Sequence, residues 1–389
     1  MFRIHHFVRE ALQPGPVPPR RDLPGPVVIW NLIRRCNLAC RHCYTNSYDK
    51  DFPGELTTTQ VFQGLADLKA AGVRVLMLSG GEPLLRPDLF EIAARAKELG
   101  FYTGLSSNGT RIGAHNIEAI AAVGFDYLGV SLDGLGATND EFRRTAGAFE
   151  AALAGLRLAR DHGIKVGVRT CLTQQTAHDL PAMLRFLETE GIDKFYLSHL
   201  NYTGRGYINR GVDAHGEMTR AALELLFEEA RRCLEQGVER EFVTGNNDAD
   251  GVYLLRWVER HLPERAAHVR ACLAAWGGNA TGVNIANIDA TGDVHPDSFF
   301  QSYTLGNILR RPFKDIWSDV SDPFLRGLKQ RPRPVSGRCG ACSHLDVCNG
   351  NTRVRAFMLS KDFWAEDPGC YLSDEELGVS PTNDNARQG

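Results

Sequence analysis

The sequence predicts an α/β protein in which an open, partial (β/α)6 barrel is followed by a small metal-bearing domain. Six apolar segments rich in β-branched residues alternate with segments of helical period. Strands that are joined through helices run parallel, with the helices outside the sheet. Six units are fewer than a complete eight-fold barrel, and a doubly wound sheet is the alternative. Seven of the ten cysteines gather in two groups, which suggests two metal sites.

The elements follow one another in a regular order. The expected strands are residues 27–33, 73–78, 101–105, 127–132, 165–172 and 194–200. The expected helices are residues 57–70, 88–99, 116–123, 148–162, 179–190 and 218–236. Most of these helices are followed by a glycine, the residue that most often ends a helix. Further on we expect a helix over 253–273 and a hairpin within 277–294, turning at Thr291-Gly292-Asp293.

Composition divides the chain into four parts. Residues 1–26 form a Pro-rich N-terminal arm, residues 27–240 the barrel, residues 241–377 a small domain held by metal rather than by a large core, and residues 378–389 a disordered tail. A net charge of −3 gives no electrostatic case for nucleic acid or an anionic membrane. The N-terminus lacks the apolar core of a signal peptide, and no apolar run is long enough for a membrane span. We therefore expect a cytoplasmic protein.

The first cysteine group, Cys36-x3-Cys40-x2-Cys43, follows the first strand, at the edge where parallel α/β folds place their sites. A [4Fe–4S] cluster takes four thiolates, so three would leave one iron open, as reactive centres require. A zinc site that recruits His42 or another ligand is the alternative.

The segment 36–44 (CNLACRHCY) resembles the cluster loop of the radical S-adenosylmethionine (SAM) enzymes. The resemblance implies a TIM-like partial barrel in which the three cysteines hold a [4Fe–4S] cluster and SAM chelates the open iron. His42 takes the place of the family's aromatic residue beside the adenine. The segment Gly80-Gly81-Glu82-Pro83 matches the family motif that contacts the methionyl amino group.

Further residues at strand ends agree with this family. Ser131 and Arg143 have the spacing of the serine and arginine that hold the SAM carboxylate in relatives. Ser107 and Asp133 are further SAM-binding candidates, although ordinary turn and cap chemistry accounts for such residues equally well.

The second cysteine group supplies four thiolates, enough to close a cubane: Cys339, Cys342, Cys348 and Cys370. It resembles the C-terminal SPASM/twitch extension of radical SAM proteins, which carries auxiliary clusters. Two cysteine positions of the fuller versions are Thr352 and Asp297 here, so we expect one auxiliary [4Fe–4S] cluster, with zinc as the alternative. Cys272 resembles a remnant of the missing site. Cys171 and Cys233 are expected to be buried apolar residues.

Over nearly its whole length the chain resembles the members of this family that act in haem d1 biosynthesis. The resemblance implies an iron-tetrapyrrole substrate, 12,18-didecarboxysirohaem, radical attack on its C3 and C8 propionates towards oxo groups, and an electron donor such as ferredoxin or flavodoxin. A polyanionic, iron-containing substrate calls for cations and an imidazole. The catalytic candidates are His199 and Arg205; further candidates are Arg169, Arg210, His295 and Asp297.

Three alternatives stay open for the function. The chain could be a peptide-modifying SPASM/twitch maturase, the related decarboxylase of an alternative haem pathway, or a non-catalytic iron–sulfur or zinc protein. Ser298, which stands where peptide-modifying relatives carry a carboxylate base, argues against the first. The motif at residues 80–83 argues against the last, because a passive protein has no need to hold SAM.

Overall fold

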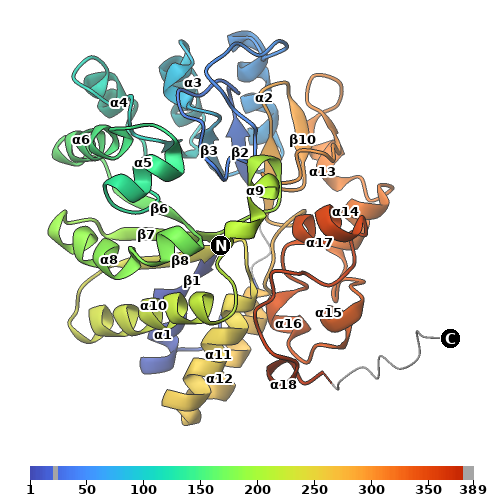
Figure 1. Ribbon diagram of the computed structural model, residues 1–389. Coiled ribbons are helices and arrows are strands. Elements are labelled where there is room, and N and C mark those ends of the chain that lie inside the picture. The colour runs from blue at the N-terminus through green and yellow to red at the C-terminus, as the bar shows by residue number, and fades with distance from the viewer. Residues whose placement is uncertain (21–24, 380–389) are drawn as a thin grey trace.

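The computed structural model describes residues 1–20 and 25–379, which form one sheet of eleven strands surrounded by helices (Figure 1). The strand order is β1-β8-β7-β6-β5-β4-β3-β2-β9-β10-β11. The two end strands, β1 and β11, do not pair with each other, so the sheet is an open barrel, as the sequence predicted. Among these residues, no helix has both the length and the apolar character that crossing a membrane requires.

The six predicted strand–helix units are all present. Their strands are β2 (Val27–Asn31), β3 (Val75–Ser79), β4 (Tyr102–Ser107), β5 (Tyr127–Ser131), β6 (Val166–Leu172) and β7 (Lys194–His199). The outer helices are α2 (Thr58–Ala70), α3 (Leu89–Glu98), α4 (Ile117–Val123), α6 (Ala148–Asp161), α8 (Leu180–Thr189) and α10 (Glu217–Glu235). Local signals define their ends: Thr57 and Gln60 form a capping box at the start of α2, and Gly124 ends α4 with φ 67°.

Short helices lie in the loops at the carboxyl ends of the strands, where the candidate site is built. They are the 3-10 turn η1 (Pro83–Leu85), α5 (Ala137–Arg143), α7 (Gln174–Ala177), α9 (Gly204–Ile208) and the 3-10 turn η2 (Arg210–Val212). The register places Asn31 beside Ser79 and Ser131 beside Arg169 at this edge. The loops that follow β2 to β7 therefore start close together in space.

The sheet is wider than predicted. The strand β8 (Glu241–Gly245) pairs in parallel with β7, and β9 (Ile285–Ile288) pairs in parallel with β2. Residues assigned to the small domain therefore extend the barrel at both sides. The predicted hairpin is confirmed, since β9 pairs antiparallel with β10 (Asp293–His295), which pairs with β11 (Gly306–Asn307).

The N-terminal arm expected over residues 1–26 instead begins with ordered structure. The strand β1 (Phe2–Arg3) pairs with β8, and the helix α1 (Ile4–Leu12) contacts α10 and α12 (Figure 1). Phe2, Phe7 and Val8 are buried in the main core. The Pro-rich composition applies only to the connection that follows α1, which is why the packed residues ahead of it escaped the prediction.

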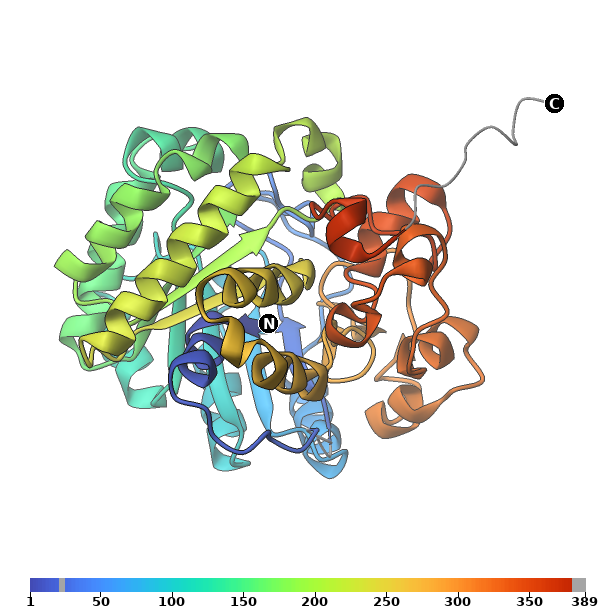
Figure 2. The ribbon, with the colours of Figure 1, turned by 90° about the horizontal axis from the view of Figure 1, so that it is seen from below.

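The C-terminal part, residues 306–379, lies beside the barrel, away from α5 to α8 (Figure 2). The single helix expected over 253–273 is two helices, α11 (Ala249–His261) and α12 (Ala266–Trp276), separated by the turn η3 (Pro263–Arg265) because Pro263 cannot continue a helix. The remaining helices are α13 (Phe313–Ser318), α14 (Pro323–Lys329), α15 (Gly337–Ala341), α16 (Leu345–Cys348), α17 (Arg353–Ser360) and α18 (Asp374–Leu377). Of the expected tail 378–389, residues 380–389 lie outside the described residues.

Candidate active site

The loop that follows β2 carries the first three cysteines and closes on itself. Its two ends meet where the Cys36 amide donates to the Tyr48 carbonyl over 3.1 Å. Cys36 and Cys40 are buried and Cys43 is half-buried. Burial raises the pKa of Cys36 to about 12, and Cys40 and Cys43 are close enough to contribute. Three neighbouring thiols, two of them buried, do not readily ionise together without a cation. Such an environment is typical of the ligands of a metal or cluster.

A second segment, residues 203–209, supports this loop from the side of β7. Arg205 Nε donates to the Cys40 carbonyl over 2.7 Å, and Arg205 Nη1 donates to the Ser47 carbonyl over 2.9 Å. The backbone amide of Arg205 also donates to the Cys43 carbonyl over 2.9 Å. A Cβ on Gly204, whose φ is +54°, would lie 2.5 Å from that same carbonyl oxygen.

Arg205 is therefore committed to the cluster loop. It is buried, and its guanidinium also lies 4.5 Å from the centre of the Tyr48 ring. The sequence placed Arg205 at the substrate, but two of its nitrogens donate to loop carbonyls. It is a positioning residue rather than a substrate-binding cation.

The Gly-Gly-Glu motif after β3 lies against the backbone that leads into the cluster loop. The Gly81 amide donates to the Ile33 carbonyl over 2.7 Å, and the Glu82 amide donates to the Arg35 carbonyl over 2.9 Å. A Cβ at either Gly80 or Gly81 would overlap these carbonyl oxygens. Glycine is thus required here for close contact between two backbones.

The Glu82 carboxylate is buried and accepts three hydrogen bonds from within the chain. The donors are the Leu84 amide at 3.1 Å, the Ser107 hydroxyl at 2.9 Å and the Asn108 amide at 2.8 Å. Burial raises the pKa of Glu82 to about 6. Glu82 and Ser107 therefore tie the ends of β3 and β4 together.

Asp133, Arg143 and His42 meet beside Cys40. Arg143 Nη2 lies 2.5 Å from Asp133 Oδ2, and Arg143 Nη1 donates to Cys40 Sγ over 3.5 Å. His42 Nε2 lies 3.9 Å from Asp133 Oδ2, and its ring stacks on Phe142 at 4.9 Å. Burial lowers the pKa of His42 to about 4, so the ring is neutral at pH 7.

Two buried polar atoms in this group, His42 Nδ1 and Arg143 Nε, lack a hydrogen-bond partner among the described residues, and Asp133 Oδ2 has only its ion pair with Arg143. Buried polar groups are nearly always paired, so unpaired atoms gathered beside three thiols mark a place built for a polar ligand. Ser131, half-buried at the end of β5, lies at the same edge. The residues present therefore fit a cluster with bound SAM.

Arg169 lies on the inner face of the barrel. From β6 its guanidinium donates to the Ser106 hydroxyl of β4, and it also lies 5.2 Å from the Tyr196 ring centre on β7. To reach β4 it crosses β5 at Gly129, where a Cβ would lie 2.9 Å from its Cδ. A cation thus lies inside the barrel, as expected for a site that receives an anionic substrate.

His199 has a different position from the predicted one. Alternation along β7 puts it on the face of Phe195 and Leu197, but that face packs against the helices. Its Nε2 lies 3.0 Å from Asp250 Oδ2 of α11, and Asp250 also accepts from the Tyr371 hydroxyl over 3.0 Å. The prediction that His199 faces the barrel interior is wrong.

The four C-terminal cysteines come together as predicted. One cavity is lined by all of them, together with apolar residues such as Val252 and Leu345: Cys339, Cys342, Cys348 and Cys370. Burial raises the pKa of Cys370 to about 12, with Cys339 among the neighbours that add to the effect. Four converging thiols in an apolar pocket match the ligand set of a closed iron–sulfur cluster.

Asp297 and Thr352, which the sequence analysis set at cysteine positions of the fuller SPASM versions, are held by hydrogen bonds. Asp297 accepts from the Thr281 hydroxyl over 2.6 Å and from two backbone amides, and Thr352 donates to the Asn246 carbonyl over 3.0 Å. His295 is buried, with Nδ1 2.8 Å from the Tyr303 carbonyl oxygen. His295 and Asp297, which the sequence placed around the substrate, serve the local fold instead, and Arg210 is exposed.

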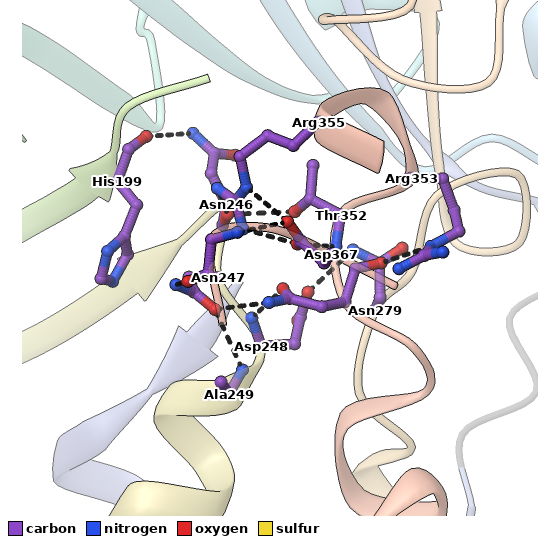
Figure 3. Close-up of polar contacts among 12 residues, drawn as sticks. His199, Asn246, Asn247, Asp248, Ala249, Asn279, Thr352, Arg353, Arg355 and Asp367 are labelled. Carbon is purple, nitrogen blue, oxygen red and sulfur yellow. Dashed lines mark hydrogen bonds and ion pairs between the residues drawn. The ribbon is translucent and has the colours of Figure 1, made fainter. Parts of the chain in front are cut away.

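The turn between β8 and α11 fastens the cysteine-bearing part to the barrel (Figure 3). Asn351 donates to Asn247 over 2.6 Å and accepts from the Asp248 amide over 2.7 Å. Arg355 donates to the Asn246 carbonyl over 2.6 Å. Near the first site, the Tyr44 ring of the cluster loop also meets Phe299 edge-on at 5.1 Å. The two cysteine groups are therefore parts of one connected structure.

Comparison with known proteins agrees with this arrangement. Residues 30–187 match the radical SAM superfamily, and residues 281–343 match SPASM, an iron-sulfur cluster-binding domain. The chain is 52% identical over 382 residues to a pre-heme d1 synthase of Dinoroseobacter shibae, covering 98% of this chain and 94% of that protein. It is 44% identical over 356 residues to an Fe-coproporphyrin III synthase of Methanosarcina barkeri, covering 91% and 89%.

Among solved structures, Streptococcus suis SuiB bound to S-adenosylmethionine matches with a TM-score of 0.69 and 18% identity, covering 90% of this chain and 78% of that chain. This likeness concerns the fold. The sequence matches show that the chain belongs to the radical SAM superfamily. It is an enzyme that uses SAM and a [4Fe–4S] cluster, and it carries a SPASM domain for auxiliary iron–sulfur chemistry.

Proposed function

We propose that this enzyme acts in haem d1 biosynthesis, on the C3 and C8 propionates of 12,18-didecarboxysirohaem towards oxo groups. The observation that carries the proposal is 52% identity across 98% of the chain to a pre-heme d1 synthase. Arg169 supports it, because a cation inside the barrel suits a substrate with several carboxylates. We place the enzyme in the cytoplasm, with ferredoxin or flavodoxin as its electron donor.

Separate sets of residues would hold the first cluster and the SAM carboxylate. Cys36, Cys40 and Cys43 would hold the first cluster, with one iron left for SAM. When bound, this centre supplies reductive cleavage of SAM and hence a radical that abstracts hydrogen. Arg143 and Ser131 would bind the SAM carboxylate, with Asp133 orienting Arg143.

Other residues position the cofactor or the second cluster. His42, neutral and stacked on Phe142, would lie beside the adenine. The backbone of residues 80–82 would accept from the SAM ammonium. The auxiliary cluster would be held by the cysteines that line one cavity: Cys339, Cys342, Cys348 and Cys370.

The test is anaerobic incubation of the reconstituted enzyme with SAM, a reductant and 12,18-didecarboxysirohaem, followed by mass analysis of the tetrapyrrole. We expect loss of the propionates. A second candidate rests on the 44% identity to an Fe-coproporphyrin III synthase, and formation of Fe-coproporphyrin III in this assay would favour it. Failure to bind any iron-tetrapyrrole would contradict both.

Cysteine variants test the two cluster assignments. Wild-type enzyme should hold about eight irons, from two cubanes. Replacing the first three cysteines by Ala should abolish SAM cleavage and leave about four irons. The Cys339, Cys342 and Cys348 triple change should also leave about four irons but retain SAM cleavage. Saturation of wild type near four irons would contradict two clusters.

A further inference from the structure

A third group of metal-binding side chains lies away from both cysteine sites, between α1 and α12. Glu10 comes from α1, whereas His268 and Cys272 are four residues apart on one face of α12. Their ligand atoms all lie within 4.8 Å of one another. Cys272 is buried, and Glu10 and His268 are 16% and 19% exposed. Cys272 does not line the cavity of the four C-terminal cysteines.

The three donors converge on one point. His268 Nε2 lies 3.0 Å from Glu10 Oε2 and 3.5 Å from Cys272 Sγ. A catalytic Cys–His–Glu relay would use the two different nitrogens of the imidazole, one for each partner. Here one nitrogen faces both partners, so the arrangement does not suit a relay. Donors that share a common centre are what a metal ion needs.

Two of the three donor separations fit a tetrahedral ion, and the third, between the Glu10 carboxylate and Cys272 Sγ, is at most 4.8 Å. With bonds of about 2.0–2.1 Å to nitrogen and oxygen and about 2.3 Å to sulfur, tetrahedral angles put N and O about 3.3 Å apart and N and S about 3.6 Å apart. The two separations in the structure are within a few tenths of an ångström of these values. A mixed sulfur, nitrogen and oxygen donor set is typical of zinc, and the partial exposure of Glu10 and His268 leaves room for water as a fourth ligand.

We propose that Glu10, His268 and Cys272 bind one Zn²⁺ ion that fastens α1 to α12. The Gly15 amide also donates to Glu10 Oε2 over 3.3 Å, which orients the carboxylate. An ion at this place would hold the N-terminal segment, whose β1 completes the sheet beside β8. The site is structural, because it lies apart from the cluster loop and the barrel interior.

The test measures zinc and iron together in the reconstituted enzyme by mass spectrometry, after incubation with one equivalent of ZnSO4 and gel filtration. We expect about one zinc and about eight irons per chain. Cys272→Ala and His268→Ala should each lower zinc at least tenfold and leave iron unchanged. Glu10→Gln keeps the side-chain shape and should also weaken zinc binding at least tenfold. This variant decides the test if the other two fold poorly.

Cys233→Ala is the matched control, because Cys233 is also a buried helical cysteine but belongs to α10 and contacts Glu229, with no histidine partner among the described residues. It should retain both metals. X-ray absorption at the zinc edge should show one sulfur among nitrogen and oxygen neighbours. A shell of four sulfurs, zinc below about a tenth per chain in the wild type, or equal zinc in all variants would overturn the proposal.

Discussion

Replacing Arg205 by Ala should empty the first cluster site selectively. The buried guanidinium donates to the Cys40 and Ser47 carbonyls, and a hydrogen bond from a charged group is worth about 1.5–3 kcal/mol. Together the two hydrogen bonds contribute at most about 3–6 kcal/mol. Arg205 Nη2 is buried and has no hydrogen-bond partner among the described residues, which reduces this net contribution. We expect the closed form of the loop to be destabilised by on the order of 3 kcal/mol relative to its open form. This raises the population of the open form roughly 100-fold.

The assay is iron content and electron paramagnetic resonance of the reduced enzyme with and without SAM. In Arg205→Ala, iron should fall from about eight towards four, and the signal that changes on SAM addition should disappear while the auxiliary signal stays. Arg210→Ala is the matched control, because Arg210 also donates to a carbonyl and lies 4.5 Å from a tyrosine ring centre but is exposed. Full cluster occupancy in Arg205→Ala, together with loss of tetrapyrrole binding, would refute the supporting role of Arg205. It would show instead that Arg205 binds the substrate.

Three further predictions concern ion pairs and hydrogen bonds. Arg143→Ala should weaken SAM binding by roughly 1.5–3 kcal/mol and keep the iron, and calorimetry showing unchanged affinity would rule out the proposed contact. His199→Gln should leave the spectrum of bound iron-tetrapyrrole unchanged, because His199 faces Asp250, and a spectral shift would show contact with the substrate. The hydrogen bond from Arg220 lowers the pKa of Glu376 from 4.5 to about 2. The Arg220–Glu376 pair therefore stabilises the folded state above pH 4.5, and this stabilisation is lost as the pH falls towards 2. Urea titrations should find Glu376→Gln less stable by on the order of 1–2 kcal/mol at pH 7, a difference that vanishes over this window; a pH-independent difference would contradict the linkage.

The sequence predicted the strand–helix units and both cysteine groups because these depend on local pattern. It did not predict which face of β7 is inside. Period-two alternation separates two faces but does not orient them, and we assumed that His199 at the strand's catalytic end faced inward. The inner face instead carries Arg169 and Tyr196, because an open barrel that receives polar ligands needs polar walls. The apolar Phe195 and Leu197 lie on the other face and pack against the helices.

The zinc-ligand candidates and the loop support were missed for a related reason. Glu10 and Cys272 are far apart in the sequence, and only the packing of α1 on α12 brings them together. Arg205 had the residue type of a substrate-binding cation, and nothing local to it shows that its partners are carbonyls more than 150 positions earlier. Side chains that act on distant backbone leave no periodic or spacing signal.

The cluster loop is held by backbone hydrogen bonds on both of its flanks. On one flank the glycine-rich motif pairs with Ile33 and Arg35, and on the other Arg205 binds the carbonyls of Cys40 and Cys43. Both contacts need glycine, since a side chain at Gly81 or Gly204 would collide with those carbonyl oxygens. The loop is thus fixed by groups that do not compete for the thiols. It follows that these contacts lower the cost of ordering the loop that cluster assembly has to meet.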